Sequence, residues 1–272
     1  MPELPEVETT RRGIEPHLTG RRITGVVVRQ PRLRWPIPDS LPRQILERRI
    51  HGVDRRGKYL LLDCGDITLL VHLGMSGSLR IVENDSPPRL HDHVDLALDS
   101  GKTLRLHDPR RFGALLCFDP REGPHPLLAE LGPEPLGDQF DGDYLHRQTR
   151  RRRTAIKSLI MDSHVVVGVG NIYASESLFL AGIRPRRAAG RITRAEAFRL
   201  VEAIRAVLTA SIEQGGTTLR DFVHEDGSHG YFSQQLRVYG RAGLPCLRCG
   251  TAIRQVVVGQ RSTFYCPHCQ ER

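Results

Sequence analysis

The sequence predicts a multidomain α+β protein, because three kinds of pattern follow one another along its 272 residues. Short β-prone runs fill the first half, a helical period replaces them after residue 137, and paired cysteines lie near the end. A chain of this length can bury substantial cores and form more than one domain. We therefore expect an N-terminal antiparallel β-sandwich with a leading helix, then a helical domain, then a small C-terminal ribbon.

A single helix should come first, at residues 5–18. Proline suits the first turn of a helix, where its missing N–H removes no hydrogen bond, and Pro5 lies there. Glu3, Glu6 and Glu8 fall near the positive end of the helix dipole, where acidic side chains are stabilising. Taken alone, these residues indicate an ordinary helix entry.

The rest of the first half consists of short apolar and β-branched runs separated by turns that contain glycine. Several such runs in succession indicate an antiparallel sandwich or barrel. We expect six strands, at residues 58–63, 67–73, 78–82, 94–98, 103–106 and 114–118.

The second half has the period of helices. The last of them should open with a capping box formed by Thr193 and Glu196. Residues 132–137, rich in glycine and proline, are the expected linker. The predicted helices span residues 144–150, 155–161, 172–180 and 193–214, and the predicted domains span residues 1–132, 133–240 and 241–272.

Glycines at residues 168 and 170 precede Asn171 at an expected helix start. Free backbone N–H groups at such a position can receive a phosphate. An asparagine that only caps the helix is the commoner explanation of the same pattern. Both interpretations remain open from the residues alone.

Four cysteines give the sharpest signal in the chain. Each C-x2-C pair places two thiolates on one tight turn, and two such turns complete the tetrahedral sulfur shell of a structural zinc ion. Residues 253–258 and 263–265 read as a hairpin about Gly259 and Gln260. We therefore predict one structural Zn²⁺ with no open coordination position, bound by Cys246, Cys249, Cys266 and Cys269, whose two pairs are separated by sixteen residues.

The charge balance points to an anionic partner. Lysine and arginine number 40 against 31 acidic residues, which gives a net charge of +9 and a pI of about 9.7. Together with a basic ribbon, this balance favours nucleic acid over other partners. No apolar run approaches the roughly 18 residues that cross a bilayer, and no signal peptide is evident. We expect a cytoplasmic protein with no membrane partner.

The N-terminus separates a binding protein from an enzyme. Because Met1 precedes the small residue Pro2, we expect its removal, which would leave a secondary amine that is partly unprotonated at neutral pH. Such an amine can attack a sugar aldehyde carbon and form an iminium. Glu3, next to it, can donate or accept the proton.

Six motifs in order resemble those of the bacterial formamidopyrimidine-DNA glycosylases, from one end of the chain to the other. The resemblance implies a helix-two-turns-helix domain in the helical half. It also implies a bifunctional DNA glycosylase and apurinic/apyrimidinic-site lyase of base excision repair, in the cytoplasm of a bacterium and associated with the nucleoid when it is bound to DNA. The motifs are residues 1–8, 56–60, 72–77, 108–113 and 168–174 and the zinc ribbon.

In that family the proline that matches Pro2 attacks C1′ of the damaged nucleotide, expels the base and holds the sugar as a Schiff base. Successive β and δ eliminations then cut both flanking phosphates. The resemblance gives Glu3 the role of general acid at the sugar ring oxygen, and Glu6 that of orienting the site. Lys58 would contact a phosphate and assist elimination, and Arg261 would grip the lesion phosphates and serve the δ step.

Other contacts follow from the same resemblance. Asn171 matches a phosphate ligand, with His72 and Lys157 as its expected neighbours. His91 and Arg152 match positions that contact DNA. Residues 217–227 resemble the loop that covers the flipped base.

An enzyme that flips a base out of the duplex leaves a void that must be filled. Met75, Arg110 and Phe112 match the residues that fill it in the family, and Arg110 would bind the cytosine left unpaired. This set favours oxidised purines, 8-oxoguanine and formamidopyrimidines, in double-stranded DNA. Without the resemblance, Met75 and Phe112 would be taken for core residues. We expect the protein to act as a monomer.

Three alternatives remain. An endonuclease VIII-like enzyme would prefer oxidised pyrimidines, but such enzymes lack this Met, Arg and Phe set. A noncatalytic zinc-ribbon DNA binder would leave Pro2 and Glu3 without a role. A metal-dependent nuclease could use residues 91–93 with His107 and Asp108, although strand alternation would place His91 and His93 on one face and Asp92 on the other.

Overall fold

The computed structural model describes residues 2–215 and 236–270. They form two compact units, one of residues 2–129 and the other of residues 130–214 with 236–270. The helical segment and the ribbon thus share the second unit, and their separation at residue 240 stays a prediction. The predicted lesion-covering loop, residues 217–227, lies outside the described residues.

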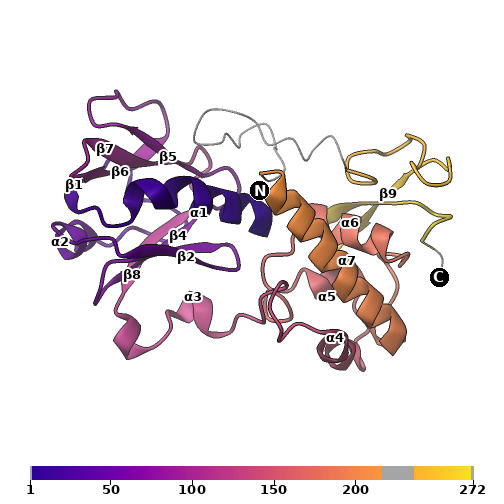
Figure 1. The fold of residues 1–272 in the computed structure, drawn as a ribbon. Coiled ribbons are helices and arrows are strands. Elements are labelled where there is room, and N and C mark those ends of the chain that lie inside the picture. Colours follow the sequence, from indigo (N-terminus) through magenta and orange to yellow (C-terminus); the bar gives the residue numbers. More distant parts are fainter. Residues whose placement is uncertain (1, 216–235, 271–272) are drawn as a thin grey trace. The chain divides into compact units, whose positions relative to one another are not determined.

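The first unit is an antiparallel sandwich of two four-stranded sheets (Figure 1). The predicted sandwich is confirmed, and it contains two strands that the sequence did not reveal, β1 and β2. One sheet has the order β1 (Ile23–Val28), β6 (Asp92–Leu98), β7 (Lys102–His107), β5 (Ser78–Glu83), and the other has the order β2 (Gly52–Arg56), β3 (Tyr59–Asp63), β4 (Thr68–His72), β8 (Ala114–Phe118).

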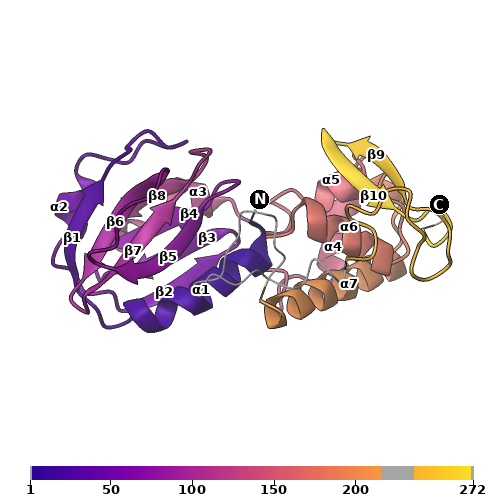
Figure 2. The same cartoon turned by 90° about the horizontal axis from the view of Figure 1, so that it is seen from above.

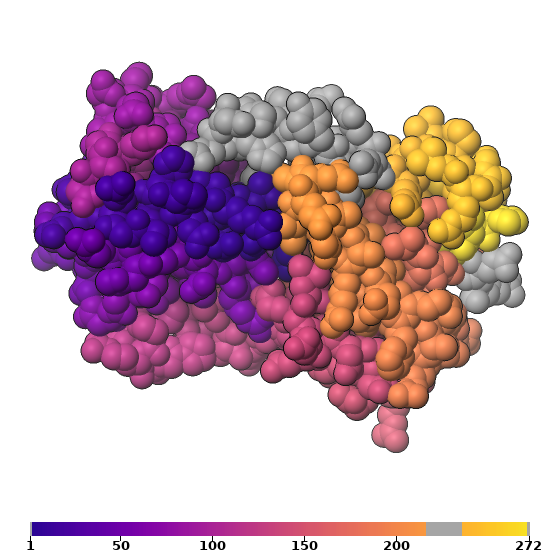
Figure 3. Space-filling model, viewed as in Figure 1, coloured from indigo at the N-terminus to yellow at the C-terminus, as the bar shows by residue number. Residues whose placement is uncertain are grey.

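Helix α1 (Leu4–Leu18) lies along the side of this sandwich, against β2 and β5, one edge strand from each sheet (Figure 2). Its inner face buries Leu4, Val7, Ile14 and Leu18, a helical spacing that matches the apolar stripe of the sequence. The outer face forms part of the surface of the unit (indigo in Figure 3). Three short segments complete the unit: α2 (Leu41–Ile45), η1 (Pro120–Glu122) and α3 (Pro126–Ala129).

The second unit is built around α7 (Arg194–Glu213), which packs against α4 (Gly142–Thr149) and α6 (Asn171–Leu180). The predicted capping box at its start is present, because the Thr193 N–H donates to Glu196 at 2.8 Å and the Glu196 N–H donates to Thr193 at 3.3 Å. Helix α5 (Ile156–Ile160) and the 3₁₀ turn η2 (Ala189–Arg191) complete the helical part. The four predicted helices are therefore confirmed to within two residues at each end.

The ribbon follows as a two-stranded hairpin of β9 (Arg254–Val258) and β10 (Arg261–Tyr265), in contact with α6. Gly259 and Gln260 both have positive φ, at 54° and 59°, as a two-residue type I′ turn requires. The predicted hairpin is confirmed. No helix in the described part of the chain is long and apolar enough to cross a membrane.

Candidate active site and nucleic-acid interface

The start of α1 holds the predicted nucleophile and acid. Pro2 and Glu3 are buried, and Glu3 is the residue before the first helical turn. Glu3 and Glu6 form a capping box, in which the Glu6 carboxylate accepts the Glu3 N–H at 2.8 Å. Glu6, itself 3% exposed, thus fixes the backbone at Glu3, and its orienting role stays a prediction.

Glu8, two residues after Glu6 in α1, connects the helix to the turn that carries Lys58. Its carboxylate accepts from Arg55 Nε at 3.0 Å, and Arg55 in turn donates to the Gly57 carbonyl at 3.0 Å. Burial raises the pKa of Glu8, but hydrogen bonds from Arg11, Arg12 and Arg55 outweigh burial and lower it overall. Sequence reasoning missed Arg55, although it lies directly before the motif that begins at residue 56.

His72, at the end of β4, is neutral at physiological pH. Burial, followed by the nearby charges of Lys58 and Arg34, lowers its pKa to about 4. Its Nδ1 accepts the Gly74 N–H at 3.1 Å, so the proton of the neutral ring lies on Nε2. Its ring packs on Tyr59, with centroids 4.8 Å apart. His72 can therefore offer one oriented N–H donor rather than a positive charge.

Met75, Arg110 and Phe112 lie on two loops that touch each other. A Cβ on Gly74, whose φ is +64°, would lie 2.6 Å from the Phe112 carbonyl oxygen, so only glycine permits this approach. Phe112 is 40% exposed, and the Arg110 guanidinium lies 4.9 Å from the centre of its ring. An exposed aromatic side chain is not a core residue, which removes the simpler explanation of Phe112.

His91 lies just before β6 in a left-handed conformation, with φ +73°. The expected strand alternation through residues 91–93 does not hold, because the β6–β7 register shifts between Asp92 and Val94. The Asp92 side chain is fully buried and accepts from Arg80 at 2.7 Å and from His107 Nδ1 at 2.9 Å, if that nitrogen carries the proton. This segment is thus a hydrogen-bonded support for the loop that carries His91.

Lys157 in α5 is 1% exposed, so the structure makes it an internal support rather than a surface cation. Its ammonium donates to Asn171 Oδ1 at 2.6 Å and to Thr263 Oγ1 at 2.7 Å. The Asn171 amide donates to the Ser262 carbonyl at 2.9 Å. Asn171 is the first residue of α6, after the capping residue Gly170, so its side chain joins the helix to β10 instead of capping it. Lys157 therefore fixes both Asn171 and the strand that begins at Arg261.

Arg152 and Arg261 are both exposed, on the loop before α5 and at the start of β10. The turn beside Arg152 is well fixed, because the Arg152 carbonyl accepts the Gly190 N–H at 2.8 Å.

A second buried support in this unit, Glu176 in α6, was not predicted. Its carboxylate accepts three backbone N–H groups, from residues 237, 238 and 239, at 2.8 to 2.9 Å. Burial raises the pKa of Glu176 in spite of these bonds, and the segment that leads into the ribbon is fixed to α6.

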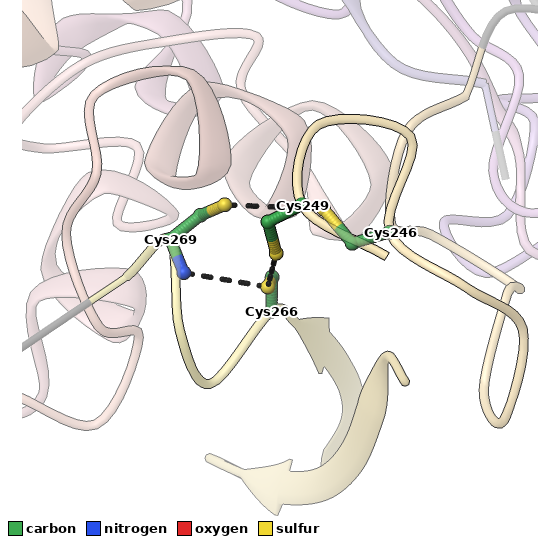
Figure 4. A group of neighbouring side chains, drawn as sticks. All are labelled: Cys246, Cys249, Cys266 and Cys269. Carbon is green, nitrogen blue, oxygen red and sulfur yellow. Dashed lines mark hydrogen bonds between the residues drawn. The ribbon is translucent and has the colours of Figure 1, made fainter. Parts of the chain in front are cut away.

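The four cysteines converge at one point (Figure 4). Their sulfur atoms all lie within 4.8 Å of one another, with 3.9 Å between Cys246 and Cys269 and 3.5 Å between Cys249 and Cys266. Tetrahedral zinc, with Zn–S bonds of about 2.3 Å, requires sulfur separations of about 3.8 Å. The Cys269 N–H also donates to Cys266 Sγ at 3.3 Å, as it would to a thiolate. The residues fit one structural zinc ion.

No other group of three or more His, Cys, Asp or Glu side chains in residues 2–215 and 236–270 lies close enough to hold a metal. The ligand set considered for a metal-dependent nuclease, residues 91–93 with His107 and Asp108, is therefore not assembled. The Asp92 carboxylate accepts hydrogen bonds from Arg80 and His107, and the Asp108 carboxylate accepts hydrogen bonds from Ser76 and Gly113.

Comparison with known proteins decides the family. The model of the formamidopyrimidine-DNA glycosylase N-terminal domain matches residues 1–115, that of its H2TH domain residues 131–223, and the zinc finger found in FPG and IleRS residues 243–272. The formamidopyrimidine-DNA glycosylase of Thioalkalivibrio sulfidiphilus is 68% identical over 270 residues, covering 99% of this chain and all of the relative. That of Thiobacillus denitrificans is 62% identical with the same coverage. The chain belongs to the formamidopyrimidine-DNA glycosylase family.

Solved members of the family share the fold. A point mutant of the Lactococcus lactis FPG, in complex with a Fapy-dG containing DNA, is 33% identical with a TM-score of 0.93, and the match covers all of both chains. MutM (FPG) protein from Thermus thermophilus is 43% identical with a TM-score of 0.88, covering 99% of this chain and 98% of the other. The α+β fold with a helix-two-turns-helix part and a zinc ribbon is therefore confirmed.

Proposed function

We propose that this chain excises oxidised purines opposite cytosine in duplex DNA and then cleaves the strand, with the Pro2 amine as nucleophile. Membership of the family makes the chain a bifunctional DNA glycosylase and apurinic/apyrimidinic-site lyase of base excision repair. The observation that carries the assignment of residues is the start of α1, where Pro2 and Glu3 are buried side by side on a backbone fixed by Glu6.

The chemistry follows from an unprotonated secondary amine. The Pro2 nitrogen donates its electron pair to C1′ as the bond from C1′ to the base breaks, and the base leaves with the electrons of that broken bond. The Pro2 nitrogen then loses its N–H proton, which balances the proton that the departing base takes up. Opening of the sugar ring at O4′ gives the iminium, and Glu3 supplies the proton that O4′ needs. The iminium acidifies C2′, so loss of its proton expels the 3′ phosphate and a second elimination expels the 5′ phosphate.

Phosphate contacts come from both units. Lys58, held in its turn by the contact from Arg55 to Gly57, would bind a phosphate beside the lesion. His72 would donate one neutral N–H. In the second unit, exposed Arg261 and Arg152 and the half-buried Asn171 would bind phosphates, with Lys157 as the support of Asn171. His91, on its fixed loop, would add another contact.

Met75, Arg110 and Phe112 would fill the void left by the flipped base. The exposure of Phe112 and its contact with Arg110 support this role. Filling the void would offset the few kcal/mol lost on unstacking. Arg110, which would bind the opposite cytosine, would set the preference for that base.

We further propose that the protein is a monomer in the bacterial cytoplasm. Light scattering during gel filtration would test whether it is a monomer.

A second substrate class has support from one solved relative. The wild-type Lactococcus lactis FPG has been solved with an oxidized pyrimidine containing DNA, at 33% identity and a TM-score of 0.92 over all of both chains. Oxidised pyrimidines would therefore be secondary substrates of the same site. Comparing excision rates on matched duplexes that differ only in the lesion ranks the two classes.

The test of the function uses Glu3→Gln, which keeps size and amine but loses the transferable proton. Excision of 8-oxoguanine should fall about 100-fold or more, as expected for loss of a general acid, while cleavage at a preformed abasic site should fall much less. Both assays are run in a chelator that removes magnesium, where a metal-dependent nuclease would be inactive. Equal losses on the two substrates would make Glu3 a structural residue.

A further inference from the structure

Asp108, which directly follows β7, lies where three segments of the proposed DNA interface meet. Its side chain is completely buried, with 0% exposure. Oδ1 accepts the hydroxyl of Ser76 at 3.3 Å, and Oδ2 accepts the Gly113 N–H at 2.8 Å. Ser76 is the neighbour of Met75, and Gly113 that of Phe112, so one carboxylate joins the two loops that carry the void-filling residues.

The backbone of the same residue makes the third connection. The Asp108 N–H donates to the His91 carbonyl at 3.0 Å, and the Asp108 carbonyl accepts His93 Nε2 at 2.8 Å. That carbonyl also accepts the Arg111 N–H at 3.1 Å, which closes the turn that presents Arg110. Every polar atom of Asp108 therefore has a partner in a segment beside the proposed interface.

The two loops that Asp108 joins also pack closely against each other through their backbones. A Cβ on Gly113 would lie 2.7 Å from the His72 carbonyl oxygen, and one on Gly74 would meet the Phe112 backbone. The loops touch without intervening side chains, so a shift of one must displace the other. A buried carboxylate at this contact also strongly favours the single arrangement that satisfies it.

We propose that Asp108 is a positioning residue that couples the two loops through Ser76, so that Met75, Arg110 and Phe112 enter the DNA as one unit. The inference rests on the proposed void-filling role of those three residues. Asp108 touches neither the sugar nor the base, and its effect reaches the reaction only through the loops. Loosening the link should reduce the discrimination between cytosine and other opposite bases, because Arg110 reads that base.

Ser76→Ala tests the link with little risk to folding, because it removes one hydroxyl and leaves the bond from Gly113 to Asp108. We expect kcat/KM on 8-oxoguanine opposite cytosine to fall roughly fivefold, as loss of one hydrogen bond implies, and the preference for cytosine over adenine to narrow severalfold. Ser78→Ala, a buried serine in β5 outside the link, is the matched control and should change neither. A variant that is merely less stable lowers both rates equally and leaves their ratio unchanged.

Asp108→Asn is the conservative variant that should preserve the link between the two loops. Its amide oxygen can accept the Gly113 N–H while its NH₂ faces Ser76, whose hydroxyl can turn to accept, so discrimination should remain near that of the unmodified protein. If Ser76→Ala keeps the full preference for cytosine, or changes no more than Ser78→Ala, the coupling is wrong.

Phe112→Ala separates this inference from the function on which it rests. It should lower excision and discrimination, and in the double variant Ser76→Ala should add less than it does alone, because coupled residues are not additive. Full additivity would overturn the coupling and leave the void-filling role intact. An unchanged Phe112→Ala enzyme would overturn both.

Discussion

The two units hold their functional residues by different means. In the sandwich, one apolar cluster of 23 buried residues lies between the sheets, and buried polar side chains such as Asp108 and Glu6 fix the loops and the helix start. The ribbon belongs to a cluster of only 6 buried residues, of which Phe179 comes from α6 and Val238 from the segment before the ribbon, and 2 of the other four are metal-binding cysteines. The proposed catalytic residues thus rest on a self-sufficient core, whereas the position of Arg261 depends on zinc and on two buried supports, Lys157 and Glu176.

Loss of the metal should produce the largest difference between the units. Cys249→Ser removes one of four thiolates, and because zinc supplies the folding energy of such a ribbon, Arg261 loses its position. We expect zinc loss, a fall in duplex affinity of about 100-fold, and a salt dependence shallower by about 0.9 for each phosphate that the ribbon no longer neutralises. The helices and the sandwich should keep their circular dichroism.

Cys117→Ser, a cysteine outside the ribbon and half-buried in the sandwich, is the matched control and should keep both zinc and affinity. Arg261→Ala should reproduce much of the affinity loss with zinc still bound. If Cys249→Ser binds and cuts lesion DNA normally, the ribbon is only a structural cap and Arg261 has no part in the site.

An intermediate effect is expected from Lys157→Met, which preserves the apolar stem and removes the ammonium that joins α5, α6 and β10. Leaving Asn171 and Thr263 without this donor should destabilise the second unit by about 1–3 kcal/mol and weaken duplex binding with zinc retained. Lys102→Met, in a half-buried strand position of the sandwich, should do neither. Unchanged affinity for Lys157→Met would show that the bonds from Asn171 suffice to hold the hairpin.

The smallest predicted effect is a pH dependence of folding stability, and its sign differs between the two units. Burial and the charges of Lys58 and Arg34 lower the pKa of His72 to about 4, below the value of about 6.5 in an unfolded chain. The unfolded state then binds more protons between pH 6.5 and 4, so stability falls as pH falls through that window. His72→Asn, which keeps an acceptor for the Gly74 N–H, should flatten this part of the curve for the sandwich.

His164 in the second unit should behave in the opposite way. Hydrogen bonding to Asp162 raises its pKa, so its contribution is present below pH 6.5 and disappears as pH rises through the folded pKa. Denaturant titrations at a series of pH values, followed by a probe in each unit, measure both slopes. A His72→Asn curve as steep as that of the unmodified protein would refute the neutral His72.

Short β-prone runs and helical periodicity predicted most of the fold, and the two missed strands show the limit of such patterns. Strand β2 contains Gly52, Asp54 and two arginines, so it forms mainly because β3 pairs with it. Strand β1 is interrupted by Gly25 beside an irregularity in its register with β6. Neither has the alternation that identifies a strand without its partner.

The site residues likewise divide into those that the sequence could predict and those that only the fold reveals. The cysteine spacing and the N-terminal motif are local in sequence and could be predicted. The supports could not, because they join distant residues: Glu176 holds a backbone segment about sixty residues away, and Asp108 meets Ser76 thirty-two residues back. Only the folded chain shows that Lys157 is buried and that Phe112 is exposed.

Reductive trapping tests the central claim, that the N-terminus of the sandwich performs the chemistry. Borohydride added during reaction with an 8-oxoguanine:cytosine duplex reduces the iminium to a stable crosslink, and mass spectrometry of the digested complex locates it. We expect a crosslink on Pro2, with Met1 removed. The chain has only three lysines, Lys58, Lys102 and Lys157, as rival amines. A crosslink on any of these lysines, or unimpaired trapping at a lysine in Pro2→Gly, would contradict the assignment of Pro2 as the nucleophile.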